Sequence, residues 1–236
     1  FKRKNMVELY VGLDLGGSHI SSWAIDANGK TYDPFCKTDI NADIKPEQLV
    51  DYLTEHSKKI FNSFSEEYVV KAIGLASPGP LDPKRGIIIS PPNLPNIINL
   101  EVVKILEEKT GLPVFLINDA DAAVLGETWL GSAQGFKNVV MLTLGTGIGS
   151  GTTKGGSEWG HTTIYSSDTR SCSCGRTNCL EAFCNTEGLI KTYLQMFGFD
   201  GCEQSLVDFR EVQWLVGEFK SGRKGRAWER WIEQYC

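Results

Sequence analysis

One imidazole and three thiols fall within nineteen residues near the middle of this chain, with the spacing H-x10-C-x-C-x4-C from His161 through Cys172 and Cys174 to Cys179. The whole sequence has only three His and seven Cys, so a cluster of this kind rarely arises by chance. One nitrogen and three sulfur donors form the ligand set of closed, four-coordinate structural zinc sites. The spacing therefore predicts a zinc-bound loop, held rigidly beside two acidic residues.

A disulfide loop in a secreted protein, or a set of unrelated buried thiols, would also place cysteines close together. After the N-terminal Phe-Lys-Arg-Lys-Asn, however, Glu8, Asp14 and two glycines interrupt the apolar residues, so no signal-type core follows. Three Cys this close to one His are typical of metal ligands in an intracellular chain. The four other cysteines are expected to be reduced thiols: Cys36, Cys184, Cys202 and Cys236.

Composition limits the classes of partner. A chain of 236 residues with 41% hydrophobic content can bury a sizeable core, in one large domain or two small ones. A net charge of -5 and a pI near 5.3 give no basic excess, which argues against nucleic acid as the main partner. No apolar run approaches the roughly twenty residues that span a bilayer, so we expect no membrane partner and a cytoplasmic location.

The N-terminal pattern predicts a strand, a glycine turn and a second strand. An apolar run over residues 8–14 ends in Leu-Gly-Gly-Ser-His, and residues 20–25 are β-prone. A dinucleotide-binding fold or a Walker loop would have a helix directly after the glycines. Asn28-Gly29 predicts a hairpin into a third strand over 30–37, despite Pro34.

The same strand, glycine turn and strand recur about half the chain later. A strand predicted over 139–144 ends in Gly-Thr-Gly-Ile-Gly, with β-prone residues beyond it. This recurrence indicates two related α/β halves that offer their glycine turns to a shared cleft, although glycine at strand ends is common enough for coincidence. The other predicted elements are helices over 46–64, 100–109 (closed by Gly111), 120–130 and from 226 onward, and strands over 69–76 and 114–117.

Several residues are suited to phosphate and sugar chemistry. Glycine turns let backbone N–H groups approach an anion closely. Asp14 at a strand end can hold a magnesium ion through water. Taken alone, however, each of the two turns could be a tight hairpin that binds no ligand. Asp119 follows a predicted strand and can accept a proton from a hydroxyl, unless Asn118 or Asp119 merely caps the next helix. A polyhydroxylated ligand would need further hydrogen-bonding groups, which Asn93, Asn118, Glu158 and Glu181 could supply. Residues of these types are individually more often ordinary surface residues or helix caps.

Seven motifs, taken in chain order between about residues 10 and 185, resemble the ROK family of sugar kinases and regulators. They are Asp-Leu-Gly-Gly-Ser, Ser-Pro-Gly-Pro-Leu-Asp, Pro-Asn-Leu-Pro, Asn-Asp-Ala-Asp-Ala-Ala, Leu-Gly-Thr-Gly-Ile-Gly, Glu-Trp-Gly-His and Cys-Ser-Cys-Gly-Arg-Thr-Asn-Cys-Leu-Glu. The resemblance implies the actin-like, ribonuclease H-like, hexokinase-type duplicated α/β fold, with two domains around a cleft. We expect a small N-terminal α/β domain over 1–118 and a larger α/β domain with the zinc loop over 119–236, incomplete at its C-terminus.

The resemblance also implies an activity, namely ATP-dependent phosphorylation of a hexose at its primary hydroxyl. Glucose is the leading substrate, with N-acetylmannosamine, N-acetylglucosamine and fructose as alternatives. A non-catalytic sugar sensor or transcriptional regulator of the same family is the other interpretation, but such regulators carry a helix-turn-helix domain first, and here the first strand begins near the N-terminus. The expected cofactors and partners are ATP, Mg²⁺, a structural Zn²⁺ and a sugar, and we also expect a homodimer.

The resemblance assigns roles to individual residues. Asp119 is the catalytic base. The sugar would be held by Gly79, Asn93, Asn118, Asp119, Glu158, His161 and Glu181. The phosphate and magnesium turns would contain Asp14, Gly16, Gly17, Ser18, Gly145, Thr146 and Gly147. The zinc ligands would be His161, Cys172, Cys174 and Cys179.

The chain departs from the family pattern at three places. Only two glycines separate Lys154 from Ser157, where the family has a longer hairpin. Either a loop is missing from this sequence, or the opening of the sugar site is shorter than in the family. The family's late strand and Gly-Gly turn, which contact adenosine, would follow Cys236. Asn178 replaces the glycine usual before the third cysteine, and because Asn tolerates a left-handed backbone, the zinc loop should survive.

Overall fold

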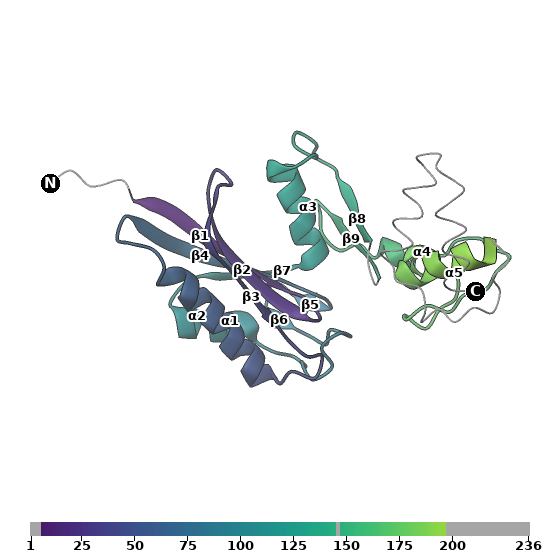
Figure 1. Cartoon of the computed structure of the whole chain (residues 1–236), viewed down its shortest axis with the longest axis horizontal. Helices are drawn as coiled ribbons and strands as arrows, with labels where there is room; N and C mark the ends of the chain where they lie inside the picture. The colour runs from purple at the N-terminus through teal and green to yellow at the C-terminus, as the bar shows by residue number, and fades with distance from the viewer. Residues whose placement is uncertain (1–5, 145–146, 197–236) are drawn as a thin grey trace, which may run out of the picture. The chain divides into compact units, whose positions relative to one another are not determined.

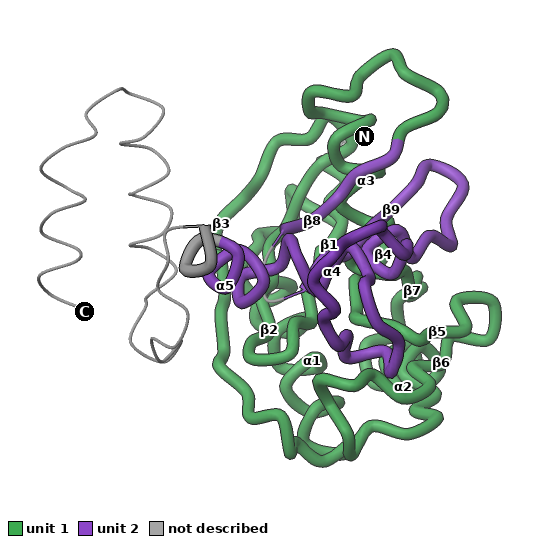
Figure 2. Tube along the Cα trace, turned by 90° about the vertical axis from the view of Figure 1, so that its right-hand side faces the viewer, with its two compact units in different colours: residues 1–139 green, residues 140–236 purple. Residues whose placement is uncertain are grey.

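A computed structural model of the chain describes residues 6–144 and 147–196 (Figure 1). The chain divides into two compact units, residues 1–139 (unit 1) and 140–236 (unit 2), each of which mixes helices and strands (Figure 2). The predicted domain boundary between residues 118 and 119 stays a prediction. The helix predicted from residue 226, Cys202 and Cys236 lie outside the described residues.

Unit 1 is built on a five-stranded sheet with the order β3-β2-β1-β4-β7. The strands are β1 (Val7–Leu15), β2 (His19–Asp26), β3 (Thr31–Asp39), β4 (Tyr68–Ser77) and β7 (Val114–Asn118). β2 is antiparallel to β1 and β3, whereas β1, β4 and β7 are parallel to one another. Every strand predicted in this unit is found at its predicted place. The apolar runs of β1, β2, β4 and β7 supply the buried positions of the sheet, whereas β3 is placed by its hairpin with β2.

The β2–β3 hairpin confirms the turn predicted at Asn28-Gly29. Gly29 has a φ of 86°, and the Asp26 carboxylate accepts hydrogen bonds from the backbone N–H groups of Asn28 at 2.8 Å and Lys30 at 3.1 Å. β3 is an edge strand, with a neighbour on one side only. Pro34 is tolerated there because an edge strand can lack a backbone N–H on its outer side.

Helix α1 (Pro46–Phe61) begins with proline at its first turn, where a missing N–H costs nothing. The predicted extension to residue 64 was wrong. The backbone N–H and the hydroxyl of Ser63 both donate to the Ile60 carbonyl, at 3.2 and 2.7 Å, and these bonds close the last turn.

Helix α2 (Val102–Thr110) begins two residues later than predicted, because Leu100 pairs with Ile88 of a neighbouring strand instead of joining the helix. The Leu100 and Ile88 backbones exchange two hydrogen bonds, at 2.9 and 3.0 Å. Ile88 is the last residue of β6 (Ile87–Ile88), which forms a small hairpin with β5 (Leu81–Asp82). The helix ends at Gly111 as predicted, with a left-handed φ of 72°.

The core of unit 1 lies between the sheet and helices α1 and α2, which cover one face of it (Figure 1). Alternate residues of β1 and the apolar stripes of both helices are buried there: Leu9, Val11, Leu13, Leu15, Leu49, Leu53, Val102 and Leu106. Each fully buried side chain of this size contributes about 1.5–3 kcal/mol. This packing fixes the sheet whose strand ends carry the predicted site.

Unit 2 contains the second hairpin, formed by β8 (Val140–Leu144) and β9 (Ile148–Thr152), with Leu144 opposite Ile148. The two strands predicted there are therefore present and pair with each other. After a turn around residues 153–156 come the 3-10 helix η1 (Trp159–His161) and the helices α4 (Leu180–Cys184) and α5 (Thr186–Met196).

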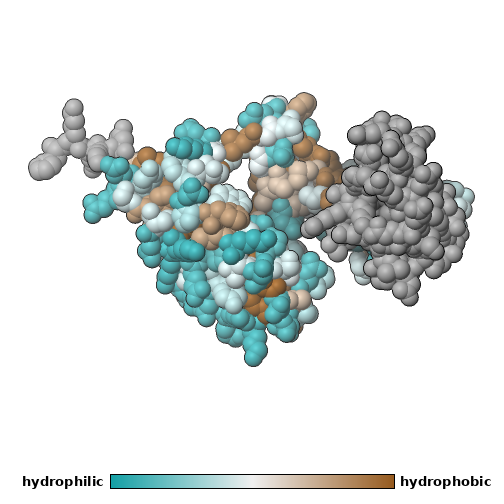
Figure 3. All heavy atoms as spheres, viewed as in Figure 1, coloured by the Kyte–Doolittle hydropathy of each residue, from teal (hydrophilic) through white to brown (hydrophobic). Residues whose placement is uncertain are grey.

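The visible surface of unit 1 is mostly hydrophilic, with isolated apolar patches (Figure 3). In the part of the chain that the structure describes, no helix combines the length and the apolar character needed to cross a bilayer.

Candidate functional site

Three parallel strands of unit 1 end side by side, and the predicted site residues of this unit other than Asn93 lie at or just after those ends. In the sheet register Asp14 on β1 is opposite Ala76 on β4, and Ser77 is opposite Asn118 on β7. In open α/β sheets, ligands bind outside the carboxyl ends of the strands. The fold therefore gathers Asp14 and the residues that follow β4 and β7 at one edge of the sheet.

Asn118 is the N-cap of helix α3 (Asp119–Leu130), which begins directly after β7. Its Oδ1 accepts hydrogen bonds from the backbone N–H groups of Ala120 at 3.0 Å and Asp121 at 3.3 Å. Asp119 Oδ1 also accepts from Ala120, at 2.8 Å. Capping uses the amide oxygen of Asn118, so its NH₂ group can still donate to another partner.

The carboxyl group of Asp119 has a raised pKa. Asp119 keeps an exposed surface, yet desolvation by the surrounding protein is the main cause that raises its pKa, and the negative charge of Asp14 raises it further. Hydrogen bonds from the Ala120 backbone and the Asn118 side chain oppose this shift. A carboxylate with a raised pKa beside a second carboxylate is a stronger base than an ordinary surface aspartate.

Two glycines bring predicted site residues together. A Cβ at Gly17 would lie 2.9 Å from the Cβ of Asn93, so a side chain there would push Asn93 away. A Cβ at Gly79 would lie 3.6 Å from Nδ2 of Asn118. The first glycine turn is thus placed against the Pro-Asn-Leu-Pro segment, and the loop after β4 against the start of α3.

The first glycine turn is a closed hairpin. The backbone N–H of Gly16 donates to the His19 carbonyl at 2.9 Å, and the exposed Ser18 hydroxyl lies 3.3 Å from Nδ1 of His19. His19 is a polar neighbour of this turn that the motif pattern did not single out. In the second turn Gly147 is described, whereas the predicted residues Gly145 and Thr146 lie outside the described part of the chain.

Unit 2 brings the four predicted metal ligands into one cluster. Their donor atoms all lie within 4.8 Å of one another. His161 Nδ1 is 3.5 Å from Cys172 Sγ, and the sulfur atoms of Cys174 and Cys179 are 3.6 Å apart. A tetrahedral zinc site with bonds of about 2.0–2.3 Å separates its donors by roughly 3.5–3.8 Å, so the donor set fits zinc.

Two left-handed residues shape the loop that carries the cysteines. Gly175 has a φ of 83° and Asn178 a φ of 59°. The Gly175 N–H donates to the Cys172 carbonyl at 3.0 Å, and the Cys172 N–H donates to the Arg176 carbonyl at 2.9 Å. The expectation that Asn178 adopts the left-handed backbone in place of glycine is therefore confirmed.

Two thiols of the cluster have pKa values displaced from that of an ordinary cysteine. Hydrogen bonding to Arg176 lowers the pKa of Cys174 to about 6, whereas burial raises the pKa of Cys179 to about 11. Because the metal ligand is the thiolate, metal binding would release the proton that Cys179 holds at neutral pH. Among the described residues all five cysteines are free thiols.

The acidic residues beside the cluster differ in their surroundings. Glu181 lies at the first turn of α4, and its Oε2 accepts a hydrogen bond from the Ile148 N–H at 2.8 Å. Glu158 precedes η1 and is exposed, and its backbone carbonyl accepts from the His161 N–H at 3.1 Å. The fold thus places Glu158, His161 and Glu181 in one unit, close to β9.

Gly160 lets η1 approach β9 closely. A Cβ at this position would overlap the backbone carbonyl of Ile148, which cannot move without disturbing the hairpin. The Ser150 hydroxyl accepts from the Trp159 N–H at 2.8 Å and donates to the Ser157 carbonyl at 3.0 Å, which anchors η1 further.

We expect Gly160→Ala to lower the free energy of unfolding by about 1–3 kcal/mol, because overpacking against the backbone forces η1 outward. Glu158 and His161 move with η1, so sugar affinity should fall as well if they hold a sugar as the family resemblance implies. The control is Gly126→Ala in α3, where an added Cβ meets nothing within 4 Å and alanine should slightly stabilise the helix. Thermal unfolding and calorimetric sugar titration measure both effects, and a Gly160→Ala protein as stable as the control would contradict this account.

The loop that carries the cysteines, residues 170–179, is called the metal loop. Two of its arginines were not anticipated from the sequence. Arg170 is only 5% exposed; its Nε donates to Asp168 at 2.7 Å, and a guanidinium N–H donates to the Gly188 carbonyl at 2.8 Å. Arg176 donates to the His161 carbonyl at 2.7 Å. The only local signal for Arg170 is an acidic residue two positions earlier, which is too common to predict a buried arginine.

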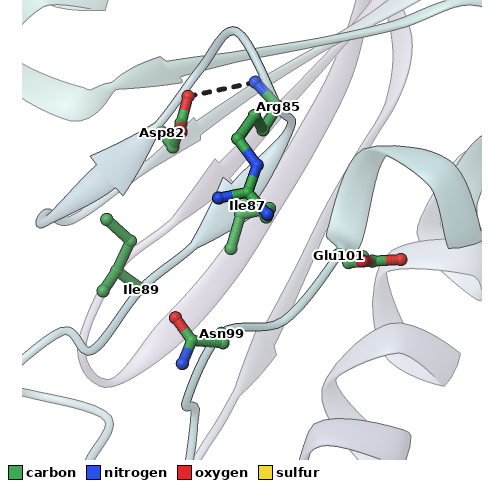
Figure 4. Close-up of a pocket in the computed structure, with 6 residues that line it drawn as sticks. All are labelled: Asp82, Arg85, Ile87, Ile89, Asn99 and Glu101. Carbon is green, nitrogen blue, oxygen red and sulfur yellow. Dashed lines mark hydrogen bonds between the residues drawn. The ribbon is translucent and has the colours of Figure 1, made fainter.

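A separate pocket of about 320 Å³ lies at the β5–β6 hairpin of unit 1 (Figure 4). Its lining residues are Asp82, Arg85, Ile87, Ile89, Asn99 and Glu101. The Arg85 N–H donates to the Asp82 carboxylate at 3.0 Å, as the dashed line shows. None of the predicted site residues line this pocket, and its charges of both signs favour no particular ligand.

The sequence pattern of the ROK family matches residues 10–220 of this chain. The chain belongs to the ROK family. The predicted resemblance is thereby confirmed, and the His–Cys₃ cluster is typical of the zinc site in this family.

Relatives within the ROK family include both enzymes and regulators. The glucokinase of Thermotoga maritima is 34% identical over 84% of this chain and 63% of its own length. The glucokinase of Halalkalibacterium halodurans is 33% identical over 77% of this chain and 58% of its own length. The xylose repressor of Caldicellulosiruptor bescii is 28% identical over 86% of this chain and 52% of its own length. The chain therefore spans less than two thirds of each of these relatives.

Solved ROK structures share the fold. The ROK hexokinase of Thermus thermophilus matches with a TM-score of 0.69 and 35% identity, over 96% of this chain and 73% of that one. A ROK glucokinase of Streptomyces griseus in complex with glucose and AMPPNP matches with a TM-score of 0.65 and 28% identity, over 79% of this chain and 60% of that one. The chain is thus a mixed α/β protein with hexokinase-type structural neighbours.

Proposed function

We propose that the protein transfers the γ-phosphoryl group of ATP to the primary hydroxyl of a hexose, with glucose as the leading substrate. The observation that carries this proposal is Asp119, a carboxylate with a raised pKa at the carboxyl edge of the sheet, beside Asp14. The glucokinase relatives and the glucose complex of a ROK glucokinase support the choice of substrate.

In this mechanism Asp119 takes the proton of the sugar hydroxyl while the hydroxyl oxygen bonds to the γ-phosphorus and ADP leaves. Because the transition state is loose, the protein contributes mainly positioning and charge neutralisation. Bound magnesium would supply that neutralisation from a position near Asp14. The two glycine turns would hold the phosphates, with Gly16 closing the first turn through its N–H bond to the His19 carbonyl rather than donating to phosphate. The residues of these turns are Gly16, Gly17, Ser18, Gly145, Thr146 and Gly147.

The sugar would be held by the polar groups that the family resemblance assigns to it: Gly79, Asn93, Asn118, Glu158, His161 and Glu181. The His161 nitrogen that faces the thiols is Nδ1, so Nε2 is left to hydrogen-bond a sugar hydroxyl. Zinc on His161, Cys172, Cys174 and Cys179 would hold the loop and would orient this ring. Metal and sugar binding are therefore coupled through one imidazole.

The proposal includes the larger architecture: the actin-like, duplicated fold with domains over 1–118 and 119–236 around a cleft, assembled as a cytoplasmic homodimer. The hairpins β1–β2 and β8–β9 support the duplication, since both are antiparallel and the sequence joins both pairs of strands through a glycine-rich segment. The hexokinase-type structural neighbours also support it.

A non-catalytic sugar sensor is the second candidate, favoured by the similarity to a xylose repressor over 86% of the chain. ADP release by the full-length protein separates the two candidates when it is measured with glucose, mannose, fructose, N-acetylglucosamine and N-acetylmannosamine. We expect glucose to give the highest kcat/KM. Sugar binding in a calorimeter without ADP release for any of the five would instead establish a sensor, and faster turnover of another sugar would reassign the substrate.

A further inference from the structure

Glu181 has both carboxylate oxygens engaged by the protein. Oε2 accepts a hydrogen bond from the backbone N–H of Ile148 at 2.8 Å. Oε1 accepts from the Ser173 hydroxyl at 3.1 Å, and Cys172 Sγ lies 3.6 Å from the same oxygen. One side chain therefore connects the start of β9 with the loop that carries the cysteine ligands.

Gly147 makes the connection to β9 possible. A Cβ at this position would lie 2.8 Å from Glu181 Oε2, closer than Cβ atoms normally approach an oxygen. Ile148 is the first residue of β9 and pairs with Leu144, so its N–H lies at the turn end of the hairpin. The carboxylate thus holds the hairpin at Ile148, directly after the predicted phosphate-binding turn of residues 145–147.

Ser173 makes the connection to the metal loop. It stands between Cys172 and Cys174, so a bond to its hydroxyl restrains the backbone between two predicted ligands. Groups in the outer shell that orient metal ligands typically change metal affinity by about 10–100-fold.

We propose that Glu181 is a positioning residue that couples the metal loop to residues 147–148 of the β8–β9 hairpin, beyond any contact it makes with a sugar. The consequence for nucleotide binding rests on the proposed function, because it requires the hairpin turn to hold phosphate. The coupling between metal loop and hairpin does not, and it is testable without a substrate.

The test compares Glu181→Ala with Glu181→Gln in the full-length zinc-loaded protein. Alanine removes both bonds, whereas glutamine can accept from Ile148 through its oxygen and donate to Ser173 through its NH₂ group. We expect Glu181→Ala to accelerate hydrogen–deuterium exchange at the Ile148 amide and zinc release to a chromophoric chelator, each by about 10–100-fold. Glu181→Gln should stay close to the parent in both measurements.

The matched control is Glu158→Ala, which removes the other predicted sugar carboxylate and should leave zinc release and Ile148 exchange unchanged. If Glu181→Ala left both rates unchanged, or if Glu158→Ala altered them equally, Glu181 would have no positioning role. Two variants test the bonds separately should Glu181→Ala fail to fold: Ser173→Ala should accelerate zinc release alone, and Gly147→Ala should accelerate Ile148 exchange. Parental rates in both would overturn the proposal.

AMPPNP affinity, measured without sugar, tests the nucleotide consequence. It should fall in Glu181→Ala and recover in Glu181→Gln. Altered exchange and zinc release with unchanged AMPPNP affinity would leave the coupling in place and would count against the assignment of the hairpin turn to phosphate.

Discussion

Asp119→Asn is expected to lower kcat by about 10²–10⁴-fold, the usual contribution of a general base, while sugar affinity stays near that of the parent. The amide of asparagine has the same shape, can still accept the Ala120 N–H and can hydrogen-bond a ligand, but it cannot take a proton at neutral pH. Steady-state kinetics and calorimetric sugar titration of the full-length protein separate the two effects. Asp121→Asn, the same change of charge in the same helical turn, is the control.

The raised pKa of Asp119 gives this variant a second signature. The pKa of Asp119 is higher in the folded protein than in the unfolded chain, so the protonated form of Asp119 favours folding. This stabilisation is complete below the ordinary aspartate pKa and is lost as the pH rises through the raised pKa of the folded state. At neutral pH the ionised Asp119 therefore destabilises the fold, and Asp119→Asn should unfold at a slightly higher temperature than the parent. The difference should vanish in acid. A variant with near-normal turnover would leave Asp119 as a helix-terminal residue only, and the base would have to be sought at Asp14 or Glu158.

Cys174→Ser is expected to abolish stoichiometric zinc binding. Protein prepared without chelator should contain one zinc per chain, with bonds of about 2.0–2.3 Å in X-ray absorption spectra. Cys174 is an exposed member of the cluster, so its replacement removes a ligand without opening the core. Loss of a structural metal belongs to the largest class of single-residue effects, on the order of 4 kcal/mol.

Sugar affinity should fall together with stability in Cys174→Ser, because the loosened loop no longer holds Glu158 and Glu181, two of the groups proposed to bind the sugar. Cys184→Ser, which changes a free thiol outside the ligand set, should keep its zinc and its stability. A zinc content near zero in the parent, or a disulfide among these cysteines, would falsify the metal assignment.

The hairpins, the strands of the central sheet and the metal cluster could be predicted because their determinants are local. Apolar runs and glycine turns act over a few residues, and His161 and the three cysteines meet within nineteen residues of chain. The C-terminal end of α1 and the start of α2 could not, since they depend on the Ser63 bonds to Ile60 and on the pairing of Leu100 with Ile88.

The sequence by itself determined the family, the ligand set of the metal cluster and the residues that end the parallel strands. Only the tertiary structure decided what surrounds these residues. Asp14 acts on the pKa of Asp119 because β4 lies between β1 and β7 in the sheet, and Glu181 reaches both Ile148 and Ser173 because α4 folds back onto β9. Sheet order and such long-range contacts result from packing of the whole unit, so no local pattern of residues predicts them.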